Sequence, residues 1–249
     1  MSAQVSGPRK PAAPSVTAAV RDAPADERAA EALTPLDDVV EASAEVLMAH
    51  DPRSTRAETV RALRTELLLR RDSPRERSDA IALLSPSAGE GRSLLAADLA
   101  VAYAQTGQPT LLVDADMRRP RQHVLFPIQN RKGLSQAIEF GMAPHLYGVR
   151  NVPRLSVLTA GAVQRNPLEL LSSQRFAAMV EDWRGTYAHV VIDTAPVGEF
   201  SDGLAVASVV GRVLTLSRAQ RTPFRDMQEM LRRLAATRAQ ILGAVINHF

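Results

Sequence analysis

Several residue types are missing or scarce in this sequence, and each absence narrows what the protein can be. There is no cysteine, which excludes disulfide bonds and thiolate metal sites. Aromatic residues make up only 4% of the chain, too few for base-stacking platforms on single-stranded nucleic acid. No apolar run approaches the roughly 20 residues of a membrane span, and residues 1–50 have no signal-peptide core. We therefore expect a cytoplasmic protein.

Lysine is also scarce, since Lys10 and Lys132 are the only two, so the net charge of +3 comes almost wholly from arginine. A net charge this small does not by itself indicate a nucleic-acid partner, and basic and aromatic residues do not alternate. We expect no nucleic acid among the partners. A chain of 249 residues with 45% apolar content suits one α/β domain of about 200 residues plus a tail.

The N-terminal segment differs in composition from the rest. Residues 1–34 are rich in Ala, Pro, Ser and mixed charge and show neither helical nor strand periodicity, which is typical of a disordered arm. A short helix is expected at 36–48, and Asp51-Pro52 interrupts the pattern. We therefore divide the chain into an arm, 1–50, that is disordered or partly helical, and a domain, 51–249.

The domain begins with a predicted helix at about 57–70, in which Val60, Leu63 and Leu67 recur at helical spacing. A second set of residues, Glu58, Arg61 and Arg64, then falls within an arc of about 120° on another side. This charged arc is either a solvated face held by an ion pair between Glu58 and Arg61, or an interaction surface.

From residue 80 onward, short apolar runs alternate with helical patterns. Strands are predicted at 81–84, 110–114, 155–159, 189–193, 212–217 and 241–246. Helices are predicted at 93–106, 134–140, 173–183, 202–210 and from 222–223 to about 237, with another opening at 166. This alternation predicts an α/β fold: a doubly wound, mostly parallel sheet with helices on both faces.

A glycine-punctuated loop joins the first of these strands to the first helix. Gly89 and Gly91 allow several N–H groups to turn inward around a phosphate. The helix beyond adds its positive dipole end, and Ser93 stands where phosphate-binding loops place a magnesium ligand. The loop departs from G-x-x-x-x-G-K-[ST] at Pro86 and Arg92. Taken alone, it is also compatible with an ordinary strand-to-helix turn that binds nothing.

Two strand ends favour the ligand-binding interpretation of this loop. Asp114 and Asp116 follow one apolar strand, and Asp193 ends another. A single strand-end Asp is often only a helix N-cap. However, ligands of open α/β sheets bind at the carboxyl edge of the strands, where these carboxylates and the loop would meet. Mg²⁺ takes one or two carboxylates together with phosphate oxygens, so the combination predicts a magnesium–nucleotide site.

Together, these segments resemble the nucleotide-binding motifs of bacterial tyrosine kinases, the cytoplasmic autokinases of capsule and exopolysaccharide synthesis that include chain-length determinant protein tyrosine kinases. The resemblance rests on 85–93 (SPSAGEGRS), 111–120 (LLVDADMRRP) and 191–197 (VIDTAPV) with Ser201-Asp202. Residues 161–171 are similar to the family's G-x-x-P-P-N-P-x-E-L-L segment, and Glu58-x-x-Arg61-x-x-Arg64 matches its oligomerisation helix. The similarity spans roughly 51–249 and favours the interaction surface over the solvated face.

This resemblance implies a P-loop NTPase fold with ATP and Mg²⁺ as cofactors. The nucleotide-binding set it implies is Ala88, Gly89, Glu90, Gly91, Arg92, Ser93, Leu94 and Asn247; the metal set is Ser93, Asp116 and Asp193; and the catalytic set is Arg92, Asp114, Asp116 and Asp193. Asp114 is the candidate for helping to remove the tyrosine proton. Asn247 would approach the base, although it is equally compatible with a simple polar strand end. Glu58, Arg61 and Arg64 would form a homo-oligomer contact.

Two departures from the family pattern bear on activity. Arg92 stands where the family has a lysine, and its longer, planar side chain is not a neutral replacement. Losing one charge-assisted contact costs about 1.5–3 kcal/mol, or roughly 10- to 100-fold in binding or rate. The second departure is that the sequence stops at Phe249 without the family's tyrosine-rich tail; its tyrosines are Tyr103, Tyr147 and Tyr187. We therefore expect the phosphoacceptor to be another residue or another protein.

Three functions follow from these observations. The first is an ATP-dependent tyrosine kinase that regulates the synthesis, chain length or export of an exopolysaccharide or capsule. It would act at the inner membrane beside a separate membrane-spanning chain-length protein. The second is a nucleotide-gated scaffold with negligible catalysis. The third is a partitioning or positioning ATPase, although those proteins carry a second lysine early in the loop, where Ser87 stands here.

Overall fold

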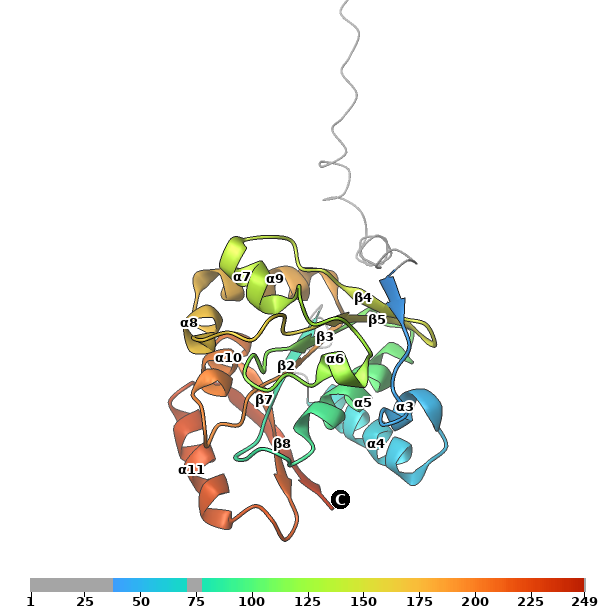
Figure 1. Ribbon diagram of the computed structural model, residues 1–249. Coiled ribbons are helices and arrows are strands. Elements are labelled where there is room, and N and C mark those ends of the chain that lie inside the picture. The colour runs from blue at the N-terminus through green and yellow to red at the C-terminus, as the bar shows by residue number, and fades with distance from the viewer. Residues whose placement is uncertain (1–37, 71–77, 249) are drawn as a thin grey trace, which may run out of the picture.

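One eight-stranded sheet organises the chain in the computed structural model, which describes residues 38–70 and 78–248 (Figure 1). Its strand order is β1-β4-β5-β3-β6-β2-β7-β8, and every neighbouring pair is parallel except β4 with β5. The strands are β1 (Val39–Val40), β2 (Asp79–Leu84), β3 (Thr110–Asp114), β4 (Tyr147–Val149), β5 (Val152–Leu158), β6 (His189–Asp193), β7 (Arg212–Arg218) and β8 (Gln240–Asn247).

Helices cover both faces of this sheet, as Figure 1 shows. One face carries α3 (Leu47–His50), α4 (Thr55–Leu69), α5 (Arg92–Ala104) and α6 (Gln122–Leu125). The other carries α7 (Leu134–Phe140), α8 (Pro167–Leu171), α9 (Gln174–Thr186), α10 (Asp202–Val210) and α11 (Phe224–Ala235). Successive side chains of a strand point to opposite faces. Accordingly, Leu112 of β3 packs in one core while Leu111 and Val113 pack in the other.

The predicted doubly wound, mostly parallel sheet is confirmed. The bounds of β3, β6, α7 and α10 are those predicted, and the other expected elements differ by a few residues. Outside the 36–48 segment, two elements were not predicted: the four-residue helix α6 and the three-residue antiparallel strand β4. Both are too short for a hydrophobic period to develop.

The predicted helix at 36–48 is wrong within its described part. Val39–Val40 form β1 instead, in register with Gly148 and Val149 of β4, and only Leu47–His50 are helical. Two consecutive β-branched residues suit a short edge strand. Residues 38–50, grouped with the arm in the sequence analysis, pack onto the domain, where Val46 and Met48 are fully buried. The rest of the expected arm, 1–37, lies outside the described residues.

A buried carboxylate fastens the segment that precedes β2 to α5, the helix that begins at the glycine-rich loop. Asp98 of α5 is fully buried, and its Oδ2 lies 2.7 Å from Nη2 of Arg56 on α4. Its Oδ1 accepts a hydrogen bond from the backbone N–H of Met48 at 3.2 Å. Burial raises the pKa of Asp98, and the charge of Arg56 opposes that rise. Arg56 therefore compensates a charge that would otherwise be buried alone.

Replacing Arg56 by alanine tests this anchor. Because Arg56→Ala leaves Asp98 buried without its cation, we expect it to lower the free energy of unfolding by about 2–3 kcal/mol, measured by chemical denaturation. The matched control is Arg225→Ala, since Arg225 is 88% exposed and pairs with Asp226 on the surface. Such pairs contribute about 0–1 kcal/mol, and equal losses in the two variants would contradict the anchor.

Candidate active site

The loop between β2 and α5 has the backbone conformation that its glycines predict. Gly89 has φ +76° and Gly91 has φ +91°, in the left-handed region that side chains disfavour. Gly91 is the N-cap of α5, so the first turn of that helix opens directly onto the loop. Ala88 and Gly89 at the crest are exposed, which leaves the loop open to a ligand.

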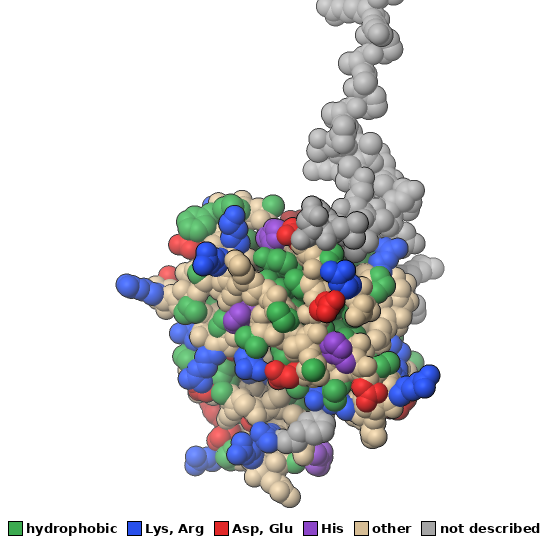
Figure 2. Space-filling view, turned by 45° about the vertical axis from the view of Figure 1, so that its right-hand side comes forward, with side chains coloured by type: hydrophobic (Ala, Val, Ile, Leu, Met, Phe, Trp, Pro, Cys, Tyr) green, Lys and Arg blue, Asp and Glu red, His purple; other side chains and the backbone are tan. Residues whose placement is uncertain are grey.

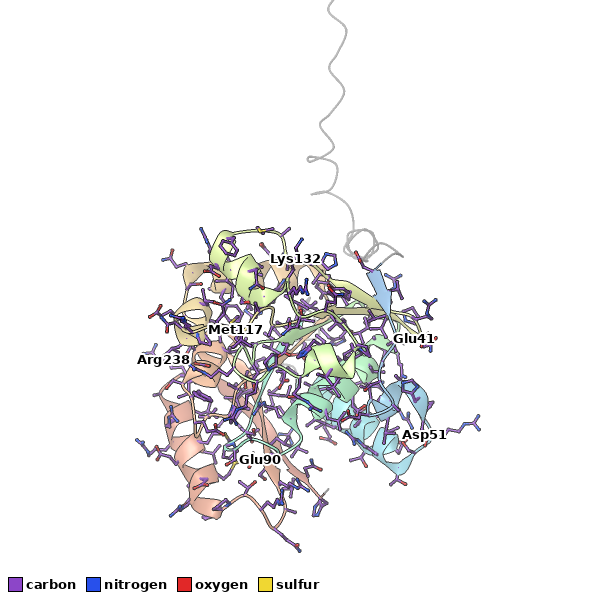
Figure 3. All side chains as sticks on the ribbon, viewed as in Figure 1. Glu41, Asp51, Glu90, Met117, Lys132 and Arg238 are labelled. Carbon is purple, nitrogen blue, oxygen red and sulfur yellow. The ribbon has the colours of Figure 1, made fainter. Side chains whose placement is uncertain are left out.

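Glu90 fixes this loop to the connection that follows β7. Its Oε1 accepts from Oγ1 of Thr222 at 2.6 Å, and its Oε2 accepts from the N–H of Ser87 at 3.3 Å. Burial raises the pKa of Glu90, and these hydrogen bonds oppose the rise. In Figure 3, the labelled Glu90 lies near the end of β8. The loop is thus held in shape by the connection after β7.

Asn247, at the end of β8, holds the same loop from the other side. Its Nδ2 donates to the backbone oxygen of Glu90 at 2.9 Å. A Cβ atom placed on Gly91 would lie only 2.3 Å from that Nδ2, so the close approach also requires glycine. Asn247 lines a groove next to the loop rather than the loop's own pocket. Its expected contact with a base stays a prediction.

Arg92 turns its side chain inward, beneath the loop, and is only 7% exposed. Its Nε donates to Oδ1 of Asp193 at 3.1 Å, and its Nη2 donates to Oδ2 of Asp116 at 3.3 Å. The third contact runs from Nη1 to Oγ of Ser85 at 2.6 Å. The planar guanidinium therefore bridges the ends of β2, β3 and β6 in a way that a single ammonium does not reproduce.

Gln122 is a site residue that the sequence analysis missed. It begins α6, is fully buried, and its Nε2 donates to Oδ2 of Asp193 and to the backbone oxygen of Ser93, both at 2.9 Å. Its Oε1 has no hydrogen-bond partner within the described part of the chain. The only available signal was its position shortly after the Asp114–Asp116 motif, because no periodic pattern marks so short a helix.

Asp114 and Asp116 occupy different positions. Asp114 is fully buried; its Oδ1 accepts from the N–H of Asp116, and its Oδ2 accepts from the N–H groups of Arg121 and Gln122. Burial, with the adjacent Asp193 carboxylate, raises the pKa of Asp114 well above its usual value. This placement favours a role in positioning the loop after β3 over direct removal of a tyrosine proton. Asp116, by contrast, lines the open pocket.

The charges of this cluster suit a divalent cation. Asp116 and Asp193 share the single guanidinium of Arg92, so two carboxylates face one positive charge. Burial raises the pKa of Asp116, and the neighbouring Asp193 raises it further. Among residues 38–70 and 78–248 there is no group of three His, Cys, Asp or Glu with metal-holding geometry. Mg²⁺ does not need one, because phosphate oxygens and water complete its shell.

A pocket of about 390 Å³ opens over these groups. Its lining contains the expected 88–94 segment and Asp116, while Asp114 and Asp193 lie outside the lining and are fully buried. The lining residues that the sequence did not predict are Glu45, Arg119, Arg121, Leu125 and Pro196. Arg121 pairs with Glu45 at 3.6 Å, and Arg119 pairs with Glu199 at 3.3 Å. Glu45 precedes the predicted domain and carried no motif.

The charged arc of α4 makes contacts within the chain. Arg61 pairs with Glu58 at 2.7 Å and also donates to the backbone oxygen of Pro52. Arg64 donates from Nη1 to the backbone oxygen of Ala102 on α5 at 2.8 Å. Figure 2, which brings the right-hand side of Figure 1 forward, shows acidic and basic side chains mixed over that face. The expected homo-oligomer contact stays a prediction.

No helix in the described part of the chain is both long enough and apolar enough to cross a membrane.

No protein-family model matches the chain. Individual relatives do: the tyrosine-protein kinase YwqD of Bacillus subtilis is 31% identical over 204 residues, covering 81% of this chain and 85% of the relative. The tyrosine-protein kinase Etk of Escherichia coli is 30% identical over 206 residues, covering 81% of this chain and 28% of Etk. A relative from Klebsiella pneumoniae is named as a putative tyrosine-protein kinase in a cps region. It is 28% identical over 203 residues, and the match covers 81% of this chain and 28% of the relative.

Solved structures agree with these relatives. The chimerical protein CapA2B2 superposes with a TM-score of 0.77 and 29% identity, covering 91% of this chain and 99% of that one. The kinase domain of Etk from Escherichia coli gives a TM-score of 0.76 at 28% identity, covering 87% and 85%. The cell-division ATPase MinD of Pyrococcus furiosus, at 18% identity and a TM-score of 0.60, covers 69% of this chain and 73% of that one and shares the fold alone. The chain therefore belongs to the bacterial tyrosine-protein kinase family.

Proposed function

We propose that this protein is an ATP-dependent tyrosine-protein kinase that regulates the synthesis, chain length or export of a surface polysaccharide. One observation carries the proposal: the glycine-rich loop, Asp116 and Asp193 meet at the carboxyl edge of the sheet, joined by Arg92. Family membership supports the reaction, and the cps-region name of the Klebsiella relative supports the pathway.

The loop would bind the phosphates of ATP. Its exposed crest, and the unpaired N–H groups of the first turn of α5, offer hydrogen bonds to phosphate oxygens. Ser93, Asp116 and Asp193 would hold Mg²⁺, directly or through water, and the bound ion would neutralise charge on the phosphates. Gln122 orients Asp193 by occupying its second oxygen. Asp114 keeps Asp116 in place through its backbone N–H.

The reaction transfers the γ-phosphoryl group to a tyrosine. A bond forms between the tyrosine oxygen and the γ-phosphorus, the bond to the β–γ bridging oxygen breaks, and ADP leaves with that oxygen. The tyrosine proton passes to water. In phosphoryl transfer the protein mainly positions groups and stabilises charge, so no covalent intermediate on this chain is required.

The burial of the chain's tyrosines indicates where the phosphoacceptor lies. Tyr103 and Tyr187 are 1% and 5% exposed, and both pack in the core. Tyr147, half-buried at the start of β4, is the exception. The mouth of the pocket presents Arg119 and Arg121, each more than half exposed. We propose that the acceptor tyrosine lies on a separate polypeptide, such as a membrane-spanning chain-length protein that would hold this protein at the inner membrane.

Phosphate transfer tests the proposal directly. We expect purified protein with Mg²⁺ and radiolabelled ATP to transfer label to tyrosine on a co-expressed partner or an acidic tyrosine copolymer. Asp116→Asn removes one carboxylate charge from the pocket and should lower transfer about 10- to 100-fold, the scale of losing a charged contact.

The comparison variant for this assay is Arg92→Lys, which restores the family residue. If the wild type transfers phosphate and Arg92→Lys transfers as much or more, the protein is a kinase that tolerates arginine at this position. ATP binding without transfer in the wild type, with transfer in Arg92→Lys, would support the nucleotide-gated scaffold instead. Absence of ATP binding in both proteins would contradict the nucleotide site itself.

The second part of the proposal is that α4 carries a homo-oligomer contact. Because Glu58 and Arg61 are paired on the surface, separating the pair should change assembly and not folding. We expect Glu58→Ala to reduce the oligomeric mass measured by light scattering while leaving the thermal midpoint within a few degrees, since exposed pairs contribute about 0–1 kcal/mol. Glu181→Ala, which removes a comparable exposed carboxylate paired with Arg184 on α9, is the control. A monomeric wild type would contradict the contact.

A further inference from the structure

The guanidinium of Arg92 occupies the carboxylate oxygens that a metal ion would need. It contacts Asp116 Oδ2 and Asp193 Oδ1 at the same time, from a side chain that is 7% exposed. Ser85 fixes the third nitrogen at 2.6 Å. We propose that Arg92 is a resident cation of the metal position, and that it leaves this position when Mg²⁺ and nucleotide bind together. The proposal rests on the nucleotide site described under the proposed function.

The contacts make Arg92 and a metal ion mutually exclusive on these two oxygens. The other oxygens of both carboxylates are already engaged: Asp116 Oδ1 accepts the N–H groups of Arg118 and Arg119, and Asp193 Oδ2 accepts Nε2 of Gln122. A cation entering between the two strand ends therefore meets the same pair of atoms that Arg92 holds. Because ionised carboxylates this close repel one another, the site favours a bound cation in every state.

Arg92 has an alternative position close at hand. It is the first residue of α5, and it lines the open pocket beside the glycine-rich loop. Phosphates bound there would supply acceptors for the guanidinium once it leaves the carboxylates. Neither ligand alone compensates both sets of charges. Mg²⁺ without nucleotide displaces Arg92 into a pocket that holds no phosphate. Nucleotide without Mg²⁺ draws Arg92 away and leaves the two carboxylates without a cation.

The expected consequence is positive coupling between the two ligands. Each should raise the affinity for the other by the same factor, because coupling between binding sites is reciprocal. A lysine at this position would hold the two carboxylates less completely, since one ammonium lacks the planar fork that makes three separate contacts here. With Arg92, binding of either ligand to the pocket would therefore depend more strongly on the presence of the other ligand than it would with a lysine.

The decisive experiment measures Mg²⁺ alone on the nucleotide-free full chain by calorimetry. We expect Arg92→Gln to bind Mg²⁺ about 10- to 100-fold more tightly than the wild type, because the competing charged contacts are gone. Arg92→Lys should fall between them. The matched control is Arg225→Gln, which removes one positive charge from an exposed surface pair outside the pocket lining. It should change Mg²⁺ affinity by less than about threefold, in keeping with a screened surface charge.

A second readout uses the wild type alone, so that it does not depend on a variant folding. The Nε–H resonance of Arg92 should be slow to exchange in the free protein, should persist with Mg²⁺ or ADP added singly, and should shift only when both are present. Equal Mg²⁺ affinity in the wild type and Arg92→Gln, or an unchanged resonance with both ligands bound, would overturn the proposal. These two measurements do not depend on phosphate transfer. An absence of transfer would therefore contradict the proposed kinase function without contradicting the proposed role of Arg92.

Discussion

The compensation of buried negative charge by Arg92 is the interaction on which the site depends. Two parallel strands end in carboxylates at one edge of the sheet, where water is largely excluded. Leaving such charges uncompensated is costly, and burial is the main cause of the raised pKa of Asp116. The arginine that follows the loop glycines supplies the cation and, by contacting Ser85, Asp116 and Asp193, connects three strand ends.

The rest of the fold places these groups. Because β3 and β6 are parallel and in register, Asp114 stands directly opposite Asp193, and β2 on the other side of β6 delivers the loop. Glu90, Thr222 and Asn247 then hold the loop to β7 and β8. On the opposite side of α5, the pair of Asp98 with Arg56 ties α4 to the helix that starts at the site. The pocket is thus shaped by contacts that extend from α4 to β8.

The sequence revealed the parts of this arrangement that depend on local pattern. Short apolar runs located the central strands, and the carboxylates that end two of them placed Asp114 and Asp193 at the edge of the site. The direction of Arg92 was not predictable, because a side chain at the start of a helix can turn toward the loop or beneath it. Gln122 and Glu45 were missed for a related reason: they reach the site only through tertiary packing.

The segment at 36–48 shows that tertiary packing can also overturn a prediction made from local sequence. Its composition is compatible with a helix, but pairing with β4 fixes Val39 and Val40 as a strand. Similarly, the carboxylate of Asp114 looked available for proton transfer in the sequence, whereas the fold surrounds it with three backbone N–H groups. Long-range contacts decide such cases, and a hydrophobic pattern does not contain them.

The most direct test of this account is a crystal structure of the wild-type protein with ADP and Mg²⁺. We expect the metal to lie near Ser93, Asp116 and Asp193, and the guanidinium of Arg92 to have moved from the two carboxylates to a phosphate. A complex in which ADP and Mg²⁺ are bound while Arg92 still bridges Asp116 and Asp193 would contradict it.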